Sequence, residues 1–211
     1  MPTRGRRELA AKAVDYFWSQ TYENKELLIL DDEEDPSFTI RPRCTFYARR
    51  SDPMTIGSKR NTLCAISAGP IIAHWDSDDY YAPNRLAFQY TILTLSGKSV
   101  LAFHRMLFVN EEAKEAAEYM GDWEDIIGTS FMYKRDWWAN HPFEDVMIQE
   151  DLIFGRYAIR LDALVSLPDQ DRTIIARCHQ GNTSKESKDL RNHPILGGPW
   201  KAVDFATVSI P

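Results

Sequence analysis

Residues Pro70-Ile-Ile-Ala-His-Trp-Asp-Ser-Asp-Asp79 join a short apolar run to three closely spaced carboxylates. A strand that is buried on both faces has a continuous apolar sequence, and ligands of open α/β sheets bind just beyond the carboxyl ends of such strands. The sequence therefore predicts a buried strand that ends near Trp75 and places Asp76, Asp78 and Asp79 at the edge of a sheet.

Three carboxylates this close together need a compensating partner, because their mutual repulsion amounts to roughly a few kcal/mol at an intermediate dielectric constant. Magnesium and manganese ions prefer carboxylate oxygens and usually complete their coordination shells with substrate phosphates. One interpretation is therefore a divalent-metal site for a phosphorylated ligand. The other, equally well supported by this stretch alone, is a turn rich in Asp and Ser that opens the next helix.

The composition favours one globular domain. The chain has 211 residues, of which 44% are hydrophobic and 12% aromatic, enough to bury a full core. Its 25 basic and 31 acidic residues give a net charge of −6. A general nucleic-acid-binding protein needs a basic face, so this balance argues against that class and no nucleic-acid partner is expected.

Cysteine usage and hydropathy favour a cytoplasmic protein. The three cysteines, Cys44, Cys64 and Cys178, are odd in number and lie in no CxxC spacing, which argues against a disulfide framework or a zinc site. No run approaches the roughly 20 apolar residues that span a bilayer. The first seven residues lack the apolar core of a signal peptide.

Helical and strand patterns alternate along the chain. Apolar spacing and helix-start residues predict helices at 7–20, 59–68, 83–95, 111–120, 135–138 and 149–160. Strands are predicted at 26–30, up to Trp75, and at 100–104, 128–133, 164–167 and 173–178. The segment 33–58, with three prolines and a glycine, is predicted to be a loop. This alternation predicts a three-layer α/β domain.

Several blocks of sequence occur in a characteristic order. They are Met1–Leu9, Gln20–Asp32, Ser58–Asn61, Asp76–Leu86, Gly128–Met132 and Gln149–Asp151. In this order they resemble the nucleotide-sugar glycosyltransferases of family 2, whose fold is called GT-A. Asp76-Ser-Asp78 resembles that family's DxD motif, and Gln149-Glu-Asp151 resembles the acidic motif that supplies the base in inverting members.

The resemblance implies a GT-A, Rossmann-like, three-layer α/β/α sandwich with a mixed central sheet. It implies a single domain over residues 1–211, with a nucleotide-binding half at about 1–95 and an acceptor-binding half at about 96–211 that ends in a lid. Family members usually have a first strand before the position of Met1, so we expect that strand to be truncated or the true start to lie upstream. The QxxRW motif of processive synthases is absent, which favours transfer of one sugar at a time.

The resemblance also assigns residues to the nucleotide. Asp32, supported by Asp31, would accept hydrogen bonds from the base, and Thr3 would border the base through its backbone. Arg60 would face the nucleotide or the diphosphate. The residues alone leave other interpretations open, because paired aspartates after a strand are often only a turn and an arginine often lies on a solvated helix face.

The resemblance assigns other residues to binding the metal and the ribose. Asp78 would ligate Mn²⁺ or Mg²⁺, while Asp76 would meet the ribose or a metal-bound water. Asp79 has an alternative role as the cap of the helix after Pro83. His179, which follows the last predicted strand, would be a further metal ligand, although a histidine there is more often solvent-facing.

A mobile lid is expected after His179. The segment Gly181–Arg191 would close over the diphosphate, and its Lys185 and Lys188 would touch phosphate oxygens. Phosphate-binding lids of this kind close when the ligand is bound. The resemblance therefore predicts that donor binding orders this segment.

On the acceptor side, Asp151 is the candidate general base and Glu150 would orient the acceptor. The competing interpretation is that both simply stabilise a helix N-terminus, which acidic residues do by a few tenths to about 1 kcal/mol. Of the adjacent Trp137 and Trp138, one would stack on a sugar ring and the other would pack in the core, and Trp138 is assigned to the sugar.

The resulting hypothesis is a metal-dependent, inverting glycosyltransferase that moves a sugar from a uridine-linked donor to a hydroxyl acceptor. Two alternatives remain at this point. One is a GT-A-like nucleotidyltransferase, which also uses clustered carboxylates and a metal. The other is a catalytically weak sugar- or nucleotide-binding protein of the same fold.

Overall fold

The computed structural model describes residues 1–33, 44–48, 53–179, 181–182 and 200–210. Its helices are α1 (Arg7–Trp18), α2 (Ile56–Ile66), α3 (Arg85–Ser96), α4 (Arg135–Asn140) and α5 (Glu150–Arg160), with a 3₁₀ turn at Phe205–Thr207. Its strands are β1 (Pro2–Thr3), β2 (Leu27–Asp31), β3 (Cys44–Ala48), β4 (Ile71–Ala73), β5 (Tyr80–Tyr81), β6 (Val100–Asn110), β7 (Glu115–Met120), β8 (Ile127–Lys134), β9 (Leu164–Pro168), β10 (Ile174–Arg177) and β11 (Trp200–Val203). The predicted α/β alternation is confirmed.

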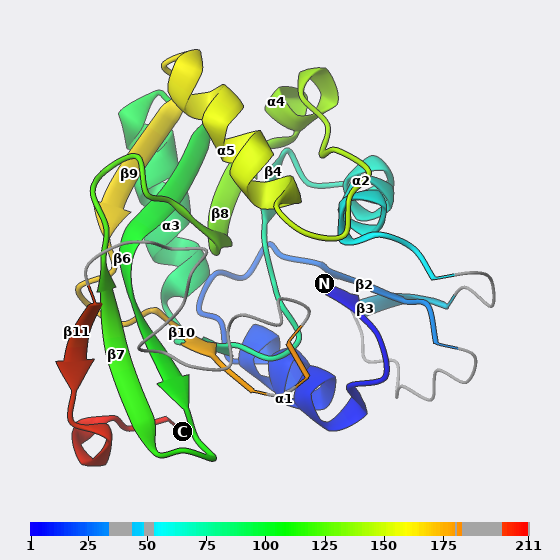
Figure 1. Ribbon diagram of the computed structural model, residues 1–211. Coiled ribbons are helices and arrows are strands. Elements are labelled where there is room, and N and C mark those ends of the chain that lie inside the picture. Colours follow the sequence, from blue (N-terminus) through cyan, green and yellow to red (C-terminus); the bar gives the residue numbers. More distant parts are fainter. Residues whose placement is uncertain (34–43, 49–52, 180, 183–199, 211) are drawn as a thin grey trace.

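The described strands form two hydrogen-bonded sheets (Figure 1). One is a parallel sheet in the order β1-β2-β3. The other is a mixed sheet centred on β6, which pairs antiparallel with β7 and β8 and parallel with β9 and β10. The outer strands β4, β5 and β11 pair with β8, β10 and β7. A mixed sheet is what the GT-A resemblance implied.

Strand β6 is longer than predicted and changes partners along its length. The expected strand 100–104 continues to Asn110. Its first half, from Val100, pairs with β8 and β9, and its second half pairs with β7 and β10. The register shifts near Phe103, and a bulge of this kind bends and twists a strand. Strand β6 therefore joins the part of the mixed sheet that contains β8 and β9 to the part that contains β7 and β10.

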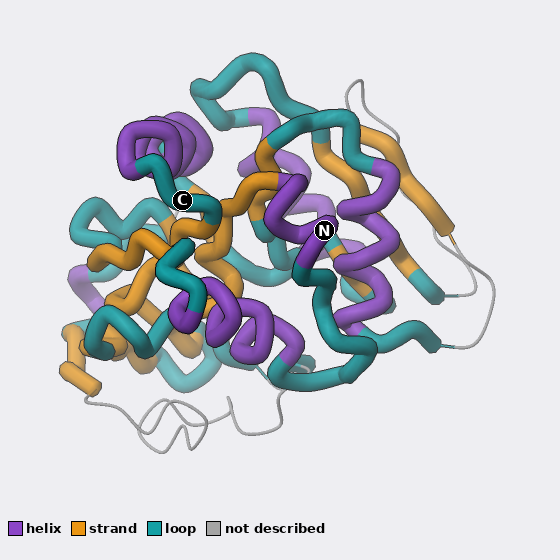
Figure 2. Tube along the Cα trace, turned by 90° about the horizontal axis from the view of Figure 1, so that it is seen from above, coloured by secondary structure: helices purple, strands orange, loops and turns teal. Residues whose placement is uncertain are grey.

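Side chains alternate across β6, so both faces of the sheet are covered. Leu101 and Phe103 belong to the cluster that includes α1 and α3 side chains. Val100 and Ala102 belong to the cluster that includes residues of α2 and α5. Figure 2 shows the strands running between helices. This is the three-layer arrangement expected from the alternating pattern.

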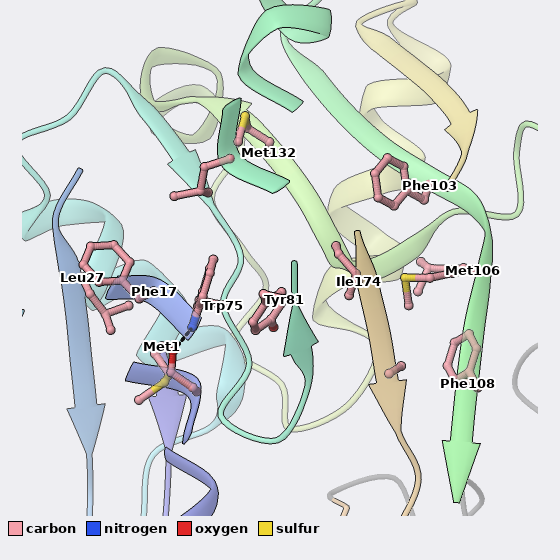
Figure 3. Close-up of a cluster of buried hydrophobic side chains, with 14 of the residues drawn as sticks. Met1, Phe17, Leu27, Trp75, Tyr81, Phe103, Met106, Phe108, Met132 and Ile174 are labelled. Carbon is pink, nitrogen blue, oxygen red and sulfur yellow. Dashed lines mark hydrogen bonds between the residues drawn. The ribbon is translucent and has the colours of Figure 1, made fainter. Parts of the chain in front are cut away.

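Trp75 anchors the acidic turn to the core (Figure 3). Its indole nitrogen donates to the Ala13 carbonyl at 3.0 Å, and its ring meets those of Phe17 and Tyr81 with centroids 6.0 and 4.0 Å apart. Aromatic pairs of this kind add about 0.5–1.5 kcal/mol beyond the burial of their surface. The residue just before Asp76 is thus held by α1 and β5.

Two predicted elements are wrong. The helix expected at 111–120 is the strand β7, preceded by a turn in which Lys114 has a φ of 53°. Its Glu and Ala content favours a helix, but pairing with β6 and β11 buries Ala116, Ala117 and Tyr119. The segment 33–58, expected to be a loop, contains β3 and the start of α2.

Other differences concern element boundaries and short strands. The sequence does not predict strands β5 and β11. Both are short, and β5 consists of only Tyr80 and Tyr81. Pro83 precedes α3 rather than lying in its first turn, and Asn84 is the N-cap residue. Within the described part of the chain, no helix is long and apolar enough to cross a bilayer.

Candidate active site

A cleft of about 640 Å³ lies where the β1–α1 loop, the turn after β4, strand β8 and the start of α5 converge. Its lining includes six of the residues predicted from sequence: Thr3, Arg60, Asp76, Asp78, Glu150 and Asp151. These residues are separated by up to 148 positions in the sequence, from Thr3 to Asp151. The fold therefore brings the two acidic motifs into one cavity.

Asp78 is surrounded by cationic and imidazole groups. Its Oδ2 accepts a hydrogen bond from Nη1 of Arg6 and lies 3.2 Å from Nε2 of His179. Arg6 also donates through Nη2 to the carbonyl of Gly181. Burial alone would raise the pKa of Asp78, but the hydrogen bond with His179 and the charge of Arg6 lower it. The carboxylate is thereby kept ionised.

Asp79 has a structural role. Its two oxygens accept hydrogen bonds from Oγ1 of Thr129, at 2.6 Å, and from the backbone N–H of Arg177, at 3.0 Å. Burial and the neighbouring Asp78 and Asp76 raise the pKa of Asp79 to about 8. The alternative role as a cap of α3 is wrong, because the carboxyl group ties the acidic turn to β8 and β10 instead.

Arg60 bridges the two acidic motifs. Its Nη2 donates to Oδ1 of Asp76 at 3.2 Å, and its Nε donates to Oε1 of Glu150 at 3.1 Å. The residue is only 7% exposed, so the interpretation of Arg60 as a solvated surface arginine is wrong. Truncating a buried charge of this kind leaves its partners uncompensated, which typically costs about 3–5 kcal/mol.

Asp151 packs directly against β8. A Cβ atom on Gly128 would lie 1.8 Å from Oδ2 of Asp151, so this approach requires glycine. Its Oδ1 accepts a hydrogen bond from the backbone N–H of Leu152 at 2.8 Å. Burial raises the pKa of Asp151, and Arg60 opposes the shift only in part. Burial likewise raises the pKa of Glu150.

The two aspartates at the end of β2, Asp31 and Asp32, are not part of the cleft lining. Oδ1 of Asp32 accepts a hydrogen bond from Nζ of Lys59 at 2.6 Å, and Lys59 also donates to the Thr3 carbonyl at 2.9 Å. Asp31 is fully buried and its Oδ1 accepts from the backbone N–H of Glu33. Asp32 and Lys59 thus fix the position of Thr3 at this corner.

Trp138 does not line the cleft. Its indole nitrogen donates to Oδ1 of Asn61 at 2.9 Å, and its ring packs against the cluster beneath α5. The ring of Trp137 stacks on His141 with a centroid separation of 4.0 Å. Neither indole lines the cleft, so the stacking role assigned to Trp138 is corrected to a packing role.

Asp78 and His179 fit a divalent ion that takes its remaining ligands from a substrate. Among the described residues, no group of three His, Cys, Asp or Glu side chains is arranged to hold an ion unaided. A carboxylate with one imidazole suits manganese better than magnesium, and both ions commonly complete their shell with phosphate oxygens and water. The predicted lid residues Lys185 and Lys188 lie outside the described residues.

The contacts that sequence reasoning missed come from basic residues. Arg6 and Arg177 bind the carboxylate and the backbone carbonyl of Asp78, and Lys59 binds Asp32. One local signal was present: Arg4, Arg6 and Arg7 cluster at the start of α1. Cations there oppose the helix dipole, so such a cluster indicates a nearby anion.

A protein-family model described as glycosyl transferase family 2 matches residues 1–146. The putative colanic acid biosynthesis glycosyl transferase WcaA of Escherichia coli strain K12 is 29% identical over 127 residues, which covers 56% of this chain and 43% of WcaA. The chain therefore spans less than half the length of that relative.

The solved structures that share the fold include those of TarS and PcManGT. S. aureus TarS 1-349 in complex with UDP-GlcNAc matches with a TM-score of 0.69 and 15% identity, over 86% of this chain and 58% of that one. The mannosyltransferase PcManGT from Pyrobaculum calidifontis, in complex with GDP-Man and Mn²⁺, matches with a TM-score of 0.62 and 14% identity, over 86% and 56%. At these identities the similarity establishes the GT-A fold.

Proposed function

The chain belongs to glycosyl transferase family 2, and from this we propose that it transfers a sugar from a nucleotide-sugar donor to a hydroxyl acceptor. We propose further that the reaction is metal-dependent and inverting and that the donor is uridine-linked. The observation that carries the proposal is the single cleft in which Arg60 bridges Asp76 of one acidic motif and Glu150 of the other.

The donor side of the cleft matches the needs of a nucleoside diphosphate. Thr3 would border the base, and Lys59, which is paired with Asp32, donates to the Thr3 carbonyl and holds that corner in place. Asp78 and His179 would hold Mn²⁺ or Mg²⁺, whose charge stabilises the negative charge of the departing diphosphate. The UDP-GlcNAc complex of TarS and the GDP-Man and Mn²⁺ complex of PcManGT support this assignment.

On the acceptor side, Asp151 accepts the proton of the attacking hydroxyl. A carboxylate with a raised pKa is a stronger base, and burial raises the pKa of Asp151 in this way. Arg60 fixes Glu150 next to it, which positions Glu150 to orient the acceptor. A base on the face opposite the leaving diphosphate leads to inversion at the anomeric carbon.

The same proposal divides the single domain into two halves. Residues 1–95 supply the acidic turn and the β1–α1 loop for the nucleotide, and residues 96–211 supply Asp151 for the acceptor. His179 crosses this division, because it belongs to the second half and contacts Asp78 of the first. Donor binding would therefore involve residues from both halves.

We also propose a reducing, cytoplasmic setting. Cys64, in α2, and Cys178, just after β10, are both free thiols and both buried at 3% exposure. Buried thiols without a disulfide partner are typical of proteins from reducing compartments.

The proposal is tested by nucleotide release. The chain is incubated with a panel of nucleotide sugars and a set of hydroxyl acceptors, with Mn²⁺ or with EDTA, and free nucleoside diphosphate is measured. We expect release that requires metal and acceptor and is greatest for a UDP-sugar, with an inverted anomeric configuration by NMR. Equal release in EDTA would contradict metal dependence, and a retained configuration would contradict the role of Asp151.

A further inference from the structure

Arg6 contacts two different parts of the candidate metal site. It occupies the N-cap position of α1, and its side chain reaches across the cleft wall. One guanidinium nitrogen donates to Oδ2 of Asp78 and another donates to the carbonyl of Gly181. Oδ2 of Asp78 is also the atom that faces His179. Arg6 therefore binds the carboxylate oxygen that a metal would need.

The turn after β10 fixes the imidazole of His179. The backbone N–H of Gly181 donates to Nδ1 of His179 at 3.1 Å, so Nδ1 is an acceptor. In a neutral ring the proton is then on Nε2, which donates to Oδ2 of Asp78 at 3.2 Å. A protonated Nε2 has no lone pair for a metal, so ligation through Nε2 requires the other tautomer.

We propose that Arg6 is a latch that keeps Asp78 and His179 from binding a metal until a nucleoside diphosphate arrives. Arg6 occupies the oxygen of Asp78 directly. Through the Gly181 carbonyl it also stabilises the turn that holds His179 in the tautomer unsuited to ligation. This inference rests on the proposed function, since that function supplies the diphosphate.

A diphosphate is the ligand best suited to release Arg6. The planar guanidinium binds phosphate oxygens in a bidentate way, and it does so more strongly than it binds a single carboxylate oxygen. Arg4 lines the same cleft, and both arginines lie at the start of α1, where the helix dipole favours an anion. Movement of Arg6 to the phosphate frees Oδ2 of Asp78 and the Gly181 carbonyl together.

The latch predicts a specific pattern of coupled binding. Metal and diphosphate each strengthen the binding of the other by the same factor, which for coupled sites is typically about 5- to 150-fold. Oxygens of a diphosphate would also ligate the ion directly, so coupling in the native chain does not by itself identify the latch. The distinguishing result is the affinity for metal alone when Arg6 is removed.

The experiment measures Mn²⁺ binding by the loss of the free-ion EPR signal, alone and with UDP or uridine, for the native chain and for Arg6→Gln. In the native chain we expect weak Mn²⁺ binding that UDP tightens by about 10-fold or more and uridine leaves unchanged. In Arg6→Gln we expect Mn²⁺ alone to bind about 10-fold tighter, UDP to bind more weakly, and the coupling to fall. Lys12→Gln, an exposed charge change on the same helix, is the control and should match the native chain.

A second measurement follows the histidine itself. Nitrogen-15 NMR of the His179 ring at neutral to mildly alkaline pH should report the Nε2–H tautomer in the native chain and a shift toward Nδ1–H in Arg6→Gln. If the native chain binds UDP and Mn²⁺ but Arg6→Gln leaves the affinity for Mn²⁺ alone unchanged, Arg6 is only a phosphate ligand and the latch is overturned. If the native chain binds neither ligand, the proposed function is overturned and the latch with it.

Discussion

Asp78 and Asp151 line one cleft, but their surroundings shift the pKa values of the two carboxyl groups in opposite directions. Asp78 has the guanidinium of Arg6 and the imidazole of His179 on one oxygen, and its pKa is lowered. Asp151 packs against the bare backbone of Gly128 and hydrogen-bonds to its own helix, and its pKa is raised. Residues of the same type therefore suit different tasks.

Under the proposed function, this difference would suit each of the two carboxyl groups to its own role. A carboxylate that must bind a cation needs to stay ionised, and the charge of Arg6 and the hydrogen bond with His179 favour the ionised form of Asp78. A carboxylate that must take up a proton gains from burial without a direct cationic partner, which is the situation of Asp151. Arg60 forms ion pairs with Asp76, near Asp78, and with Glu150, next to Asp151. One guanidinium therefore connects the surroundings of the two aspartates.

The largest effect is expected from Asp78→Asn. The amide keeps the size of the side chain but loses the charge that a divalent ion requires, so metal-dependent turnover should fall by about 10³-fold or more. The measurement is nucleotide release at saturating Mn²⁺, with circular dichroism as the check on folding. Asp76→Asn serves as the comparison and should mainly weaken donor binding. Near-normal turnover of Asp78→Asn would remove the distinction between the two sides.

Asp151→Asn tests the proposed general base on the acceptor side of the cleft. Loss of a positioned general base should lower turnover by about 10²- to 10⁴-fold while donor affinity, measured by calorimetry, changes little. The matched variant is Glu150→Gln, for which a smaller loss is expected. A severe loss in Glu150→Gln with a mild loss in Asp151→Asn would mean that the neighbouring Glu150 is the base.

A smaller effect is expected from Gly128→Ala, which changes the surroundings of Asp151 and leaves its carboxyl group in place. The added methyl group would lie 1.8 Å from Oδ2 of Asp151, so the carboxylate must move. Misplacement by about 1 Å can cost about 10²-fold in turnover. Gly69→Ala is the control, because its added Cβ would meet only Ile71, at 3.4 Å. Equal activity of both variants would show that the position of Asp151 is not critical.

The smallest effect concerns pH. Asp151 must be deprotonated to act as a base, so kcat/KM should fall tenfold per pH unit below its raised pKa. The acidic limb should lie above about 3.9, the ordinary pKa of aspartic acid. The pH–rate profile of Asp151→Asn, measured on its residual activity, should lack this limb. A limb that persists unchanged in the variant would come from another group.

The positions of the acidic motifs could be predicted because their signals are local. Asp76–Asp79 follow an apolar run, and Glu150–Asp151 begin an amphipathic helix. Their partners could not be predicted in the same way, because Arg6 and Asp78 are 72 positions apart and Arg60 and Glu150 are 90 apart. Contacts at such separations depend on the tertiary fold, which spacing alone does not reveal.

The fold shows the same division between local and distant information. Helices α1 and α5 were predicted nearly to the residue because their apolar faces repeat at helical spacing. Residues Glu115–Met120 have the composition of a helix but form β7, since two neighbouring strands bury one face of this segment. The position of Trp138 between the acceptor-side strand and Asp151 predicts a sugar contact, but its hydrogen bond to Asn61, 77 positions away, has no local sign in the sequence.

The central position of β6 has a consequence for the order in which the chain folds. Val100 pairs with Leu164 and Leu107 pairs with Ile175, so the side of β6 that faces β9 and β10 closes only between segments more than 60 residues apart. Closing such long loops costs entropy before the contacts repay it, and chains rich in distant pairings fold slowly. Residues up to Arg177 must therefore emerge from the ribosome before β6 has all its partners. Until then the edge of β6 that pairs with β9 and β10 is unpaired, and this is the stage at which the nascent chain is most exposed to aggregation.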